Sequence, residues 1–325
     1  MIKLAFVGDP HLDSTTPRSR IDDYRETSVG KLYKILDLCM NEGVTKVFFT
    51  GDMFHKFEKV DQPMSYMNTV IKALRNFKNN GIELYTVIGN HDLPHNSFLY
   101  FRNTPLYALI ESGLINHLTT DIDTVEGVVV HGLDFTQINN IPQVSKNNTK
   151  NILVMHYATD NTIPGESIDR ELLSDFDVVV TGHDHTYFGV DGVNPTMVRP
   201  GSMIRRNKDE VNRKIIIPII SVDNGIINIV EHELPIEPAD KVFKNDVFYV
   251  RQDIETQQYG YDKVFTSEFF KSRVDGGLDE IIDNLPEQIT EQSKDKIKRH
   301  LKSEGVLWKT NDKSSVTKKV EHLST

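Results

Sequence analysis

Residues 3–11 read Lys-Leu-Ala-Phe-Val-Gly-Asp-Pro-His, an apolar run that ends in a glycine, a carboxylate and an imidazole. The run has the length of a buried strand, and the polar residues mark its end. Four more apolar runs lead into similar polar clusters, at residues 44–50, 82–88, 152–155 and 178–180. Five strands that deliver polar side chains to one edge of a sheet indicate an α/β fold with its functional site at that edge.

The segments around these strands define the expected fold class. Apolar residues at helical spacing predict helices at residues 25–40, 64–77 and 105–111, and Gly43 and Gly81 end the first two. Further strands are expected at residues 127–130, 186–190, 215–222 and 226–232. Because few helices separate these later strands, a four-layer α/β/β/α sandwich fits better than a doubly wound sheet.

Length and composition bound the domain organisation. The chain has 325 residues, a formal net charge of −10 and one cysteine. We expect a main domain at residues 1–235, a small α+β cap that binds partners at residues 236–308, and a disordered tail at residues 309–325. An internal disulfide is excluded, and no apolar run reaches the roughly 18 residues of a membrane span or forms a secretory signal. A cytoplasmic protein is therefore expected, and its acidity argues against coating nucleic acid by bulk charge.

The polar clusters at the strand ends have the composition of a dinuclear metal site. One ion is expected at Asp9, His11, Asp52 and His185, and the other at Asp52, Asn90, His156 and His183, with Asp52 as the bridge. Mixed imidazole, carboxylate and amide ligands suit manganese, iron or zinc better than calcium or magnesium. Two such ions hold a hydroxide that attacks a phosphate in line.

His91 and Asp92 follow the ligand candidate Asn90 directly. The His91 imidazole is expected to face the scissile phosphate rather than the metals. Asp92 would fix the His91 tautomer through the other ring nitrogen, and the alternative for Asp92 is a turn or capping residue.

These motifs resemble those of the calcineurin-like metallophosphoesterases. Within that family the chain is similar to SbcD-type recombination nucleases, including their phage versions. Two stretches carry this closer resemblance, Gly51-Asp52-Met53-Phe54-His55 and Arg199-Pro200-Gly201-Ser202. Asp13 stands where glycine is common in the first motif.

The resemblance implies a manganese-dependent DNA nuclease, with 3′ to 5′ exonuclease and endonuclease activity in recombination or double-strand-break repair. It implies a partner, an SbcC-type ABC ATPase with a coiled coil, and a homodimer within a heterotetramer. It also implies that His91 protonates the leaving oxygen or orients the phosphate and that His55 assists near the substrate. For His55 a packing role against the following loop is the alternative.

Basic residues after the last histidine motif suggest a DNA-contacting edge. Residues 199–214 carry a local charge of +4, and the candidates for phosphate contacts are Arg199, Arg205, Arg206 and Lys208. A solvated strand end is the alternative. The predicted C-terminal helix at residues 288–301 has an apolar stripe that either docks on a partner coiled coil or covers its own cap.

Two other functions are compatible with the same motifs. The metal ligands specify phosphoester hydrolysis but not the ester, so a phosphatase or small-molecule phosphodiesterase of the same superfamily is the first alternative. A catalytically inactive scaffold that binds an ATPase is the second. Every ligand position is filled, which argues against the scaffold.

Overall fold

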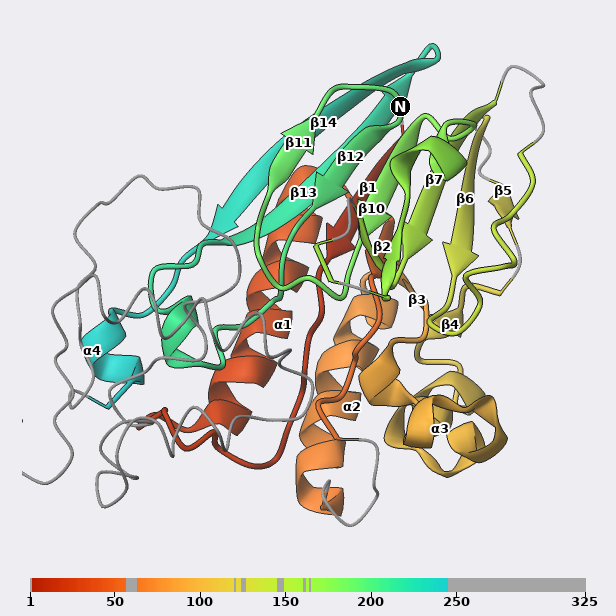
Figure 1. Cartoon of the computed structure of the whole chain (residues 1–325). Helices are drawn as coiled ribbons and strands as arrows, with labels where there is room; N and C mark the ends of the chain where they lie inside the picture. Colours follow the sequence, from red (N-terminus) through yellow and green to blue (C-terminus); the bar gives the residue numbers. More distant parts are fainter. Residues whose placement is uncertain are drawn as a thin grey trace, which may run out of the picture. The chain divides into compact units, whose positions relative to one another are not determined.

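The computed structural model describes residues 2–56, 63–119, 121–123, 127–144, 149–159, 162–163 and 165–244. The chain divides into two compact units, Met1–Phe248 and Tyr249–Thr325, and all described residues lie in the first. This unit is built on two six-stranded sheets (Figure 1). None of its described helices has the length and apolar character needed to cross a membrane.

The first sheet combines strands from both ends of the unit. Its order is β14 (Ile226–Leu234), β13 (Ile215–Asp223), β1 (Ile2–Val7), β2 (Lys46–Phe49), β3 (Glu83–Thr86) and β4 (Asn116–His117). Strands β1 to β4 are parallel, with Phe6 opposite Phe48 and Phe48 opposite Tyr85. Strands β13 and β14 extend the sheet in antiparallel fashion beside β1.

The second sheet is built from the middle of the chain. Its order is β11 (Gly189–Asp191), β12 (Thr196–Arg199), β10 (Val178–Thr181), β7 (Lys150–Met155), β6 (Val128–Leu133) and β5 (Ile122–Asp123). Strands β12, β10, β7 and β6 are parallel. The carboxyl ends of β7 and β10 therefore lie side by side, as do those of β1, β2 and β3 in the first sheet.

Two long helices cover the outer face of the first sheet. Helix α1 (Tyr24–Glu42) begins at Asp23, whose side chain accepts the backbone N–H groups of Arg25 and Glu26, and ends at Gly43 in the left-handed conformation. Helix α2 (Met64–Asn79) follows β2 and contacts α1. The apolar faces of both helices pack with Ala5, Val7 and Phe49 in one continuous cluster. Shorter helices are α3 (Pro105–Glu111) and α4 (Ala239–Val242).

A second apolar cluster joins the two sheets. Alternate residues of the buried strands meet there, including Phe6 and Phe48 from the first sheet and Val154 and Val180 from the second. A third cluster covers the far face of the second sheet, and it includes Ile168 of β9 and Leu173 of a 3₁₀ helix, Arg170–Leu173. Strand β9 (Ser167–Ile168) pairs with β8 (Ala158–Thr159). The predicted sandwich is confirmed, but this fourth layer has no α-helix among the described residues.

The predicted elements miss the two-residue strands β4, β5, β8 and β9 and differ again after the last histidine motif. The strand expected at residues 186–190 begins only at Gly189, because Thr186 N–H donates to the Asp184 carboxylate and turns the chain first. Strand β12 was not predicted. Its four residues follow a proline and show little periodicity in the sequence. In the structure, Arg170 donates to the carbonyls of Val193 and Pro195 and so orders the loop that precedes β12.

Residues beyond β14 remain attached to the main domain. Lys31 of α1 donates to the Pro235 carbonyl at 2.6 Å, and Val242 and Phe243 are buried. The predicted boundary at residue 235 is thus followed by a short segment, residues 236–244, that packs on α1. The rest of the predicted cap, its helix at residues 288–301 and the tail at residues 309–325 lie outside the described residues.

Candidate metal centre

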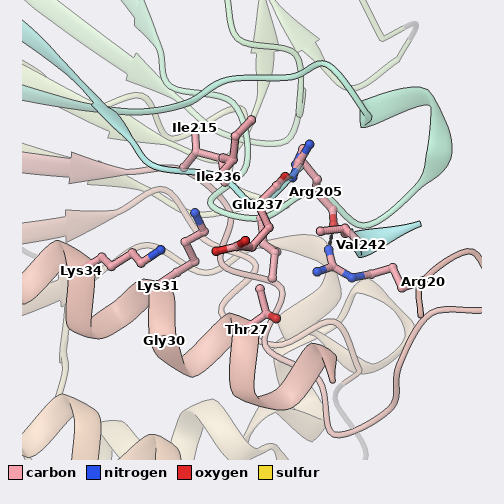
Figure 2. A pocket seen from close by; sticks show the side chains of 11 residues that line it. Arg20, Thr27, Gly30, Lys31, Lys34, Arg205, Ile215, Ile236, Glu237 and Val242 are labelled. Atoms are coloured by element: carbon pink, nitrogen blue, oxygen red, sulfur yellow. Dashed lines mark hydrogen bonds between the residues drawn. The ribbon is translucent and has the colours of Figure 1, made fainter. Parts of the chain in front are cut away.

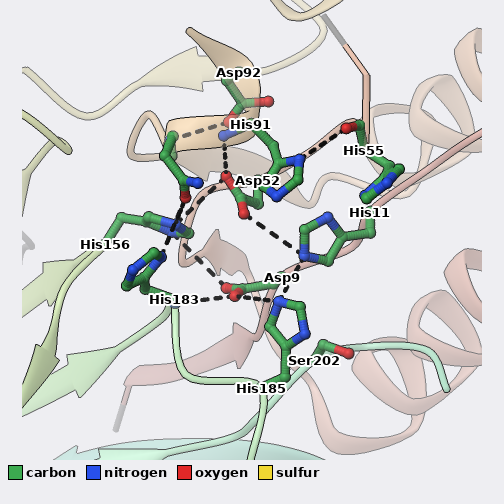
Figure 3. Close-up of polar contacts among 12 residues, drawn as sticks. Asp9, His11, Asp52, His55, His91, Asp92, His156, His183, His185 and Ser202 are labelled. Carbon is green, nitrogen blue, oxygen red and sulfur yellow. Dashed lines mark hydrogen bonds and ion pairs between the residues drawn. The ribbon is translucent and has the colours of Figure 1, made fainter. Parts of the chain in front are cut away.

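The seven predicted metal ligands lie together at one edge of the two sheets, and Figure 3 labels all of them except Asn90. Each follows the carboxyl end of a parallel strand, namely β1, β2, β3, β7 or β10. They are Asp9, His11, Asp52, Asn90, His156, His183 and His185. Because parallel strands end at the same edge, residues far apart in the sequence converge there.

The first donor group brings together Asp9, His11, Asp52 and His185, with donor atoms all within 4.8 Å of one another. The Nε2 atoms of His11 and His185 are 2.7 Å apart. Asp52 Oδ2 lies 3.6 Å from His11 Nε2, and Asp9 Oδ2 lies 3.6 Å from His185 Nε2. Two imidazole nitrogens and two carboxylate oxygens that face one point form a donor set suited to a transition metal.

The second donor group lies on the other side of Asp52. Asp52 Oδ1 is 3.4 Å from His156 Nε2, and the Asn90 side-chain oxygen is 3.0 Å from the same nitrogen. His183 Nδ1 is 3.1 Å from that Asn90 oxygen. The two carboxylate oxygens of Asp52 thus face different groups, as a ligand shared by two ions requires.

Three of the ligands have unusual backbone conformations. His11, Asp52 and His183 have φ angles of 43°, 49° and 72°, in the left-handed region that non-glycine residues rarely occupy. Each such residue costs of order 1–3 kcal/mol, and such strain clusters at functional sites. The chain therefore holds these side chains in place against a local conformational cost.

The electrostatics of the two groups favour a cation. Burial opposes protonation of His156, but the carboxylates of Asp52 and Asp9 outweigh it and raise its pKa to about 10. Although burial opposes the charge of Asp52, His156 and His11 hold its pKa well below the usual range. The donor set therefore fits two divalent cations, whose charge would replace that of the protonated imidazole.

Thr50 and Gly89 support the ligands from behind. The Thr50 hydroxyl donates to Asp9 Oδ1 at 2.7 Å, and the Thr50 carbonyl accepts from His156 Nδ1 at 2.7 Å. Gly89 lies so close to Asp52 that a Cβ there would be 2.0 Å from Asp52 Oδ1. The packing at this position admits only glycine without displacement of the bridging carboxylate.

The structure supports the alternative given for Asp92, a capping residue, over an orienting role toward His91. Its buried carboxylate accepts the backbone N–H groups of Met53 and Phe54 at 3.3 Å and of Gly89 at 3.0 Å. His91 Nδ1 instead donates to the His55 carbonyl at 2.8 Å. The prediction that Asp92 orients His91 is wrong, because Asp92 ties together the loops after β2 and β3. Burial and the Asp52 charge raise the pKa of Asp92 to about 8.

His55 lies beside the first donor group. Its ring stacks on His91 with centroids 4.7 Å apart, and it meets the His11 ring edge to face at 5.4 Å. Burial, with help from the Arg206 charge, lowers the pKa of His55 to about 4, so its imidazole is neutral at pH 7. Its buried Nδ1 atom has no hydrogen-bond partner among the described residues.

The family of the protein follows from a comparison of its sequence with known families. The profile described as calcineurin-like phosphoesterase matches residues 2–187, which include all seven ligands. The chain belongs to this family.

Two archaeal relatives of this phosphoesterase carry the name DNA double-strand break repair protein Mre11. The protein of Methanococcus maripaludis is 26% identical over 157 residues, which are 43% of this chain and 40% of that protein. The protein of Sulfolobus acidocaldarius is 26% identical over 201 residues, which are 57% of this chain and 50% of that protein. The chain thus spans at most half of the length of these relatives. A dimetal phosphatase from Danio rerio is 11% identical, with 71% of this chain and 95% of that one covered at a TM-score of 0.48.

The predicted DNA-contacting residues of the phosphoesterase differ in their surroundings. Arg199 forms an ion pair with Asp184 at 2.5 Å. Arg205 is buried and donates to the carbonyls of Val211 and Glu237. Both side chains therefore stabilise loops of the protein. Because Arg205 is buried, it is not available for contact with DNA. Arg206 and Lys208 remain candidates.

Arg205 also lines a pocket between α1 and residues 236–242 (Figure 2). Three further cations line it, Arg20, Lys31 and Lys34, together with Glu237. Arg20 is paired with Asp22 and donates to the Arg205 carbonyl. Arg205 donates to the Glu237 carbonyl and Lys31 to the Pro235 carbonyl, so these cations hold the segment after β14 on the main domain.

The Arg199-Pro200-Gly201-Ser202 stretch packs against the first motif. The N–H of Met203 donates to the carbonyls of Gly8 and Asp9, both at 3.1 Å. Ser202 Oγ accepts from Arg213 at 2.7 Å, and Arg213 also donates to the His185 carbonyl. This turn therefore fixes the loops that carry Asp9 and His185.

Two carboxylates near the ligands were not predicted. Glu166 contacts His183, and Glu210 contacts His185. Glu166 lies in a short loop with no periodic pattern, and Glu210 appeared only as a negative charge within a basic segment. Their positions depend on loop folding, for which the sequence carries no local signal.

Proposed function

We propose that this phosphoesterase is a dinuclear-metal phosphodiesterase that cleaves DNA, as a 3′ to 5′ exonuclease and an endonuclease. The observation that carries the proposal is the sharing of Asp52 between two donor groups next to His91. The names of the two Mre11 relatives support DNA as the substrate. The process that we propose is recombination or double-strand-break repair.

The two donor groups would hold two divalent ions, for which we propose Mn²⁺, and when bound these would supply Lewis acidity and lower the pKa of a nucleophilic water. The remaining chemistry falls to the chain's own residues. Because the His55 carbonyl can only accept, the Nδ1 atom of His91 must carry a proton. The Nε2 atom of His91 is then the nitrogen that faces the substrate, and it donates a proton to the leaving oxygen or a hydrogen bond to the phosphate when both ring nitrogens are protonated.

His55 and Arg206 extend this site toward the substrate. His55 is neutral at pH 7 because its pKa is about 4, so it is suited to hydrogen bonding rather than to proton donation. Arg206 lies near enough to His55 for its charge to lower that pKa. We assign Arg206 and Lys208 to contacts with the DNA backbone, which supply affinity without sequence preference.

The partner that we propose is an SbcC-type ABC ATPase with a coiled coil, bound to a homodimer of this chain in a heterotetramer. The support is the resemblance to SbcD-type nucleases together with the Mre11 relatives. Size measurement of the mixture with a candidate ATPase tests this assembly, and two separate components of unchanged size would contradict it.

The test of the activity is Mn²⁺-dependent digestion of end-labelled duplex DNA by wild type and by His91→Ala. We expect the wild type to release the label and the variant to lose at least about 100-fold in rate, the lower end for general acid catalysis. A matched control is His232→Ala on β14, a histidine outside the donor groups. The phosphodiester bis-p-nitrophenyl phosphate and the phosphomonoester p-nitrophenyl phosphate are measured in parallel.

The two small substrates distinguish the nuclease from the other two candidate functions. Intact DNA together with turnover of phosphomonoesters would overturn the nuclease proposal in favour of a phosphatase. Failure to bind two ions per chain after chelation and reconstitution would favour the inactive scaffold. Equal activity of His91→Ala and His232→Ala would remove the role assigned to His91.

A further inference from the structure

Each histidine of the last motif has a carboxylate on the side that faces away from the donor groups. His183 Nδ1 faces Asn90 in the second group, whereas its Nε2 lies 2.5 Å from Glu166 Oε2. A carboxylate accepts, so Nε2 carries the proton and Nδ1 keeps its lone pair for the donor group. The tautomer of His183 is therefore fixed by Glu166.

His185 shows the same arrangement with its nitrogens exchanged. Its Nε2 faces His11 and Asp9 in the first group, and its Nδ1 lies 3.6 Å from Glu210 Oε1. At this distance Glu210 acts on His185 through its charge. Glu210 is itself held by Arg213 at 2.9 Å and by the Asn207 N–H at 2.9 Å, and its side chain is 8% exposed.

We propose that Glu166 and Glu210 are positioning residues of the metal centre, one for each ion. Glu166 would orient His183 toward the second donor group, and Glu210 would orient His185 toward the first. This inference rests on the metal centre of the proposed function but not on DNA as substrate. Carboxylates that accept from ligand imidazoles fix ring orientation and raise ligand basicity, and their loss costs about 10–100-fold in metal affinity.

The two carboxylates differ in a way that makes them separable. The Glu166 side chain is 42% exposed, so its replacement leaves no cavity in the core, and the bond that is lost is the one to His183 under test. Glu210 is buried beside Arg213, and its removal would leave that cation unpaired. The Glu166 series is therefore the decisive one, and Glu210 is replaced only by glutamine, with melting of the metal-free protein as a check on folding.

The experiment is a Mn²⁺ titration of the full chain, in which free Mn²⁺ is counted by electron paramagnetic resonance. For Glu166→Ala we expect two binding sites, of which one is weakened by about 10–100-fold. Glu166→Gln keeps an acceptor oxygen without the charge, so it should recover part of that affinity. Glu210→Gln should weaken one site, and the double variant should weaken both. Glu111→Ala, an exposed glutamate of α3, is the matched control.

A second readout distinguishes positioning from a general structural effect. The visible spectrum of the Co²⁺-loaded protein reports ligand geometry, and Glu166→Ala should change it while the melting temperature of the metal-free protein stays constant. Unchanged affinities and an unchanged spectrum for Glu166→Ala would overturn the proposal. Because neither readout uses DNA, failure of the nuclease activity would leave this test intact.

Discussion

The Nε2 atoms of His11 and His185 lie 2.7 Å apart, although 174 residues separate them in the chain. At most one of these nitrogens can carry a proton, because two N–H groups at this distance would repel. His11 follows β1 of the first sheet and His185 follows β10 of the second. The two sheets therefore each contribute one imidazole to the same position. A shared cation is the arrangement in which both lone pairs have a partner.

We therefore expect Mn²⁺ to stabilise the folded protein. An ion that binds only the native state raises the free energy of unfolding by about 2.7 kcal/mol per site when its concentration is 100 times Kd. The melting temperature should rise with Mn²⁺ and fall again with a chelator. Asp52→Ala should abolish most of the rise because both donor groups lose a ligand. A melting temperature that is independent of Mn²⁺ would contradict the assignment of the site.

Asp92 should act on stability rather than on the orientation of His91. Asp92→Ala would leave the backbone N–H groups of Met53, Phe54 and Gly89 without their acceptor, at a cost of about 1–3 kcal/mol for buried groups. Denaturant unfolding of the metal-free protein measures this loss. Asp37→Ala, on an exposed position of α1, is the control and should change stability by no more than about 0.5 kcal/mol. Normal stability with lost activity would restore the predicted orienting role.

A pair of glycine substitutions tests the packing around Asp52. Gly89→Ala would place a Cβ 2.0 Å from Asp52 Oδ1 and 2.4 Å from the Asp52 nitrogen. We expect a loss of about 1–3 kcal/mol and weaker Mn²⁺ binding at both sites. Gly30→Ala meets nothing within 4 Å in the middle of α1 and should stabilise the protein by about 1 kcal/mol. Similar melting temperatures for the two variants would contradict this reading of the site.

The convergence of the seven candidate ligands could be predicted because their positions follow from a regular pattern. Each ligand comes directly after an apolar run, and parallel strands place such positions at one edge of a sheet. Residues as distant as Asp9 and His183 could thus be grouped without any knowledge of the loops between them. The same reasoning predicted the two-sheet core, because the apolar runs alone carry that information.

The side-chain contacts could not be predicted in the same way. The partner of His91 is the His55 carbonyl, 36 residues away, and no periodicity indicates which ring nitrogen faces a backbone oxygen. The charge count of residues 199–214 was correct, yet it could not show that Arg205 turns inward onto two carbonyls. Hydrogen-bond partners across loops depend on the final packing and not on local sequence.

Lys31 gives a pH-dependent prediction. Burial, with help from the charges of Lys34 and Arg205, lowers its pKa from 10.5 to about 8. The folded state therefore disfavours the charged form, and this cost is fully present below pH 8. Between pH 8 and 10.5 the unfolded state binds more protons than the folded state, so the free energy of unfolding of the wild type increases as pH rises. Lys31→Met removes this cost together with the bond to the Pro235 carbonyl, so its melting temperature relative to wild type should fall by about 2–4 °C between pH 7 and pH 10. Lys72→Met, an exposed position of α2, should show no such trend.

Arg206 is the proposed DNA contact whose charge also acts on His55. Its guanidinium lies 3.4 Å from Asp13 and 5.3 Å from the Tyr24 ring centre, and its side chain is 13% exposed. Arg206→Gln should weaken DNA binding equally for all sequences and reduce the slope of log K against log salt by about 0.9. Fluorescence anisotropy with duplex DNA between 50 and 200 mM salt measures both quantities.

The loss of Arg206 also leaves Asp13 without its partner, and Asp13 is 1% exposed. An unpaired buried carboxylate could destabilise the loop after β1 and weaken binding indirectly. The double variant Arg206→Gln with Asp13→Asn removes both charges and separates the two effects. If Arg206 contacts phosphate, the double variant keeps the reduced salt slope. A wild-type slope in the double variant would show that Arg206 serves only as the counterion of Asp13. Arg75→Gln, exposed on α2, should leave the slope unchanged in either case.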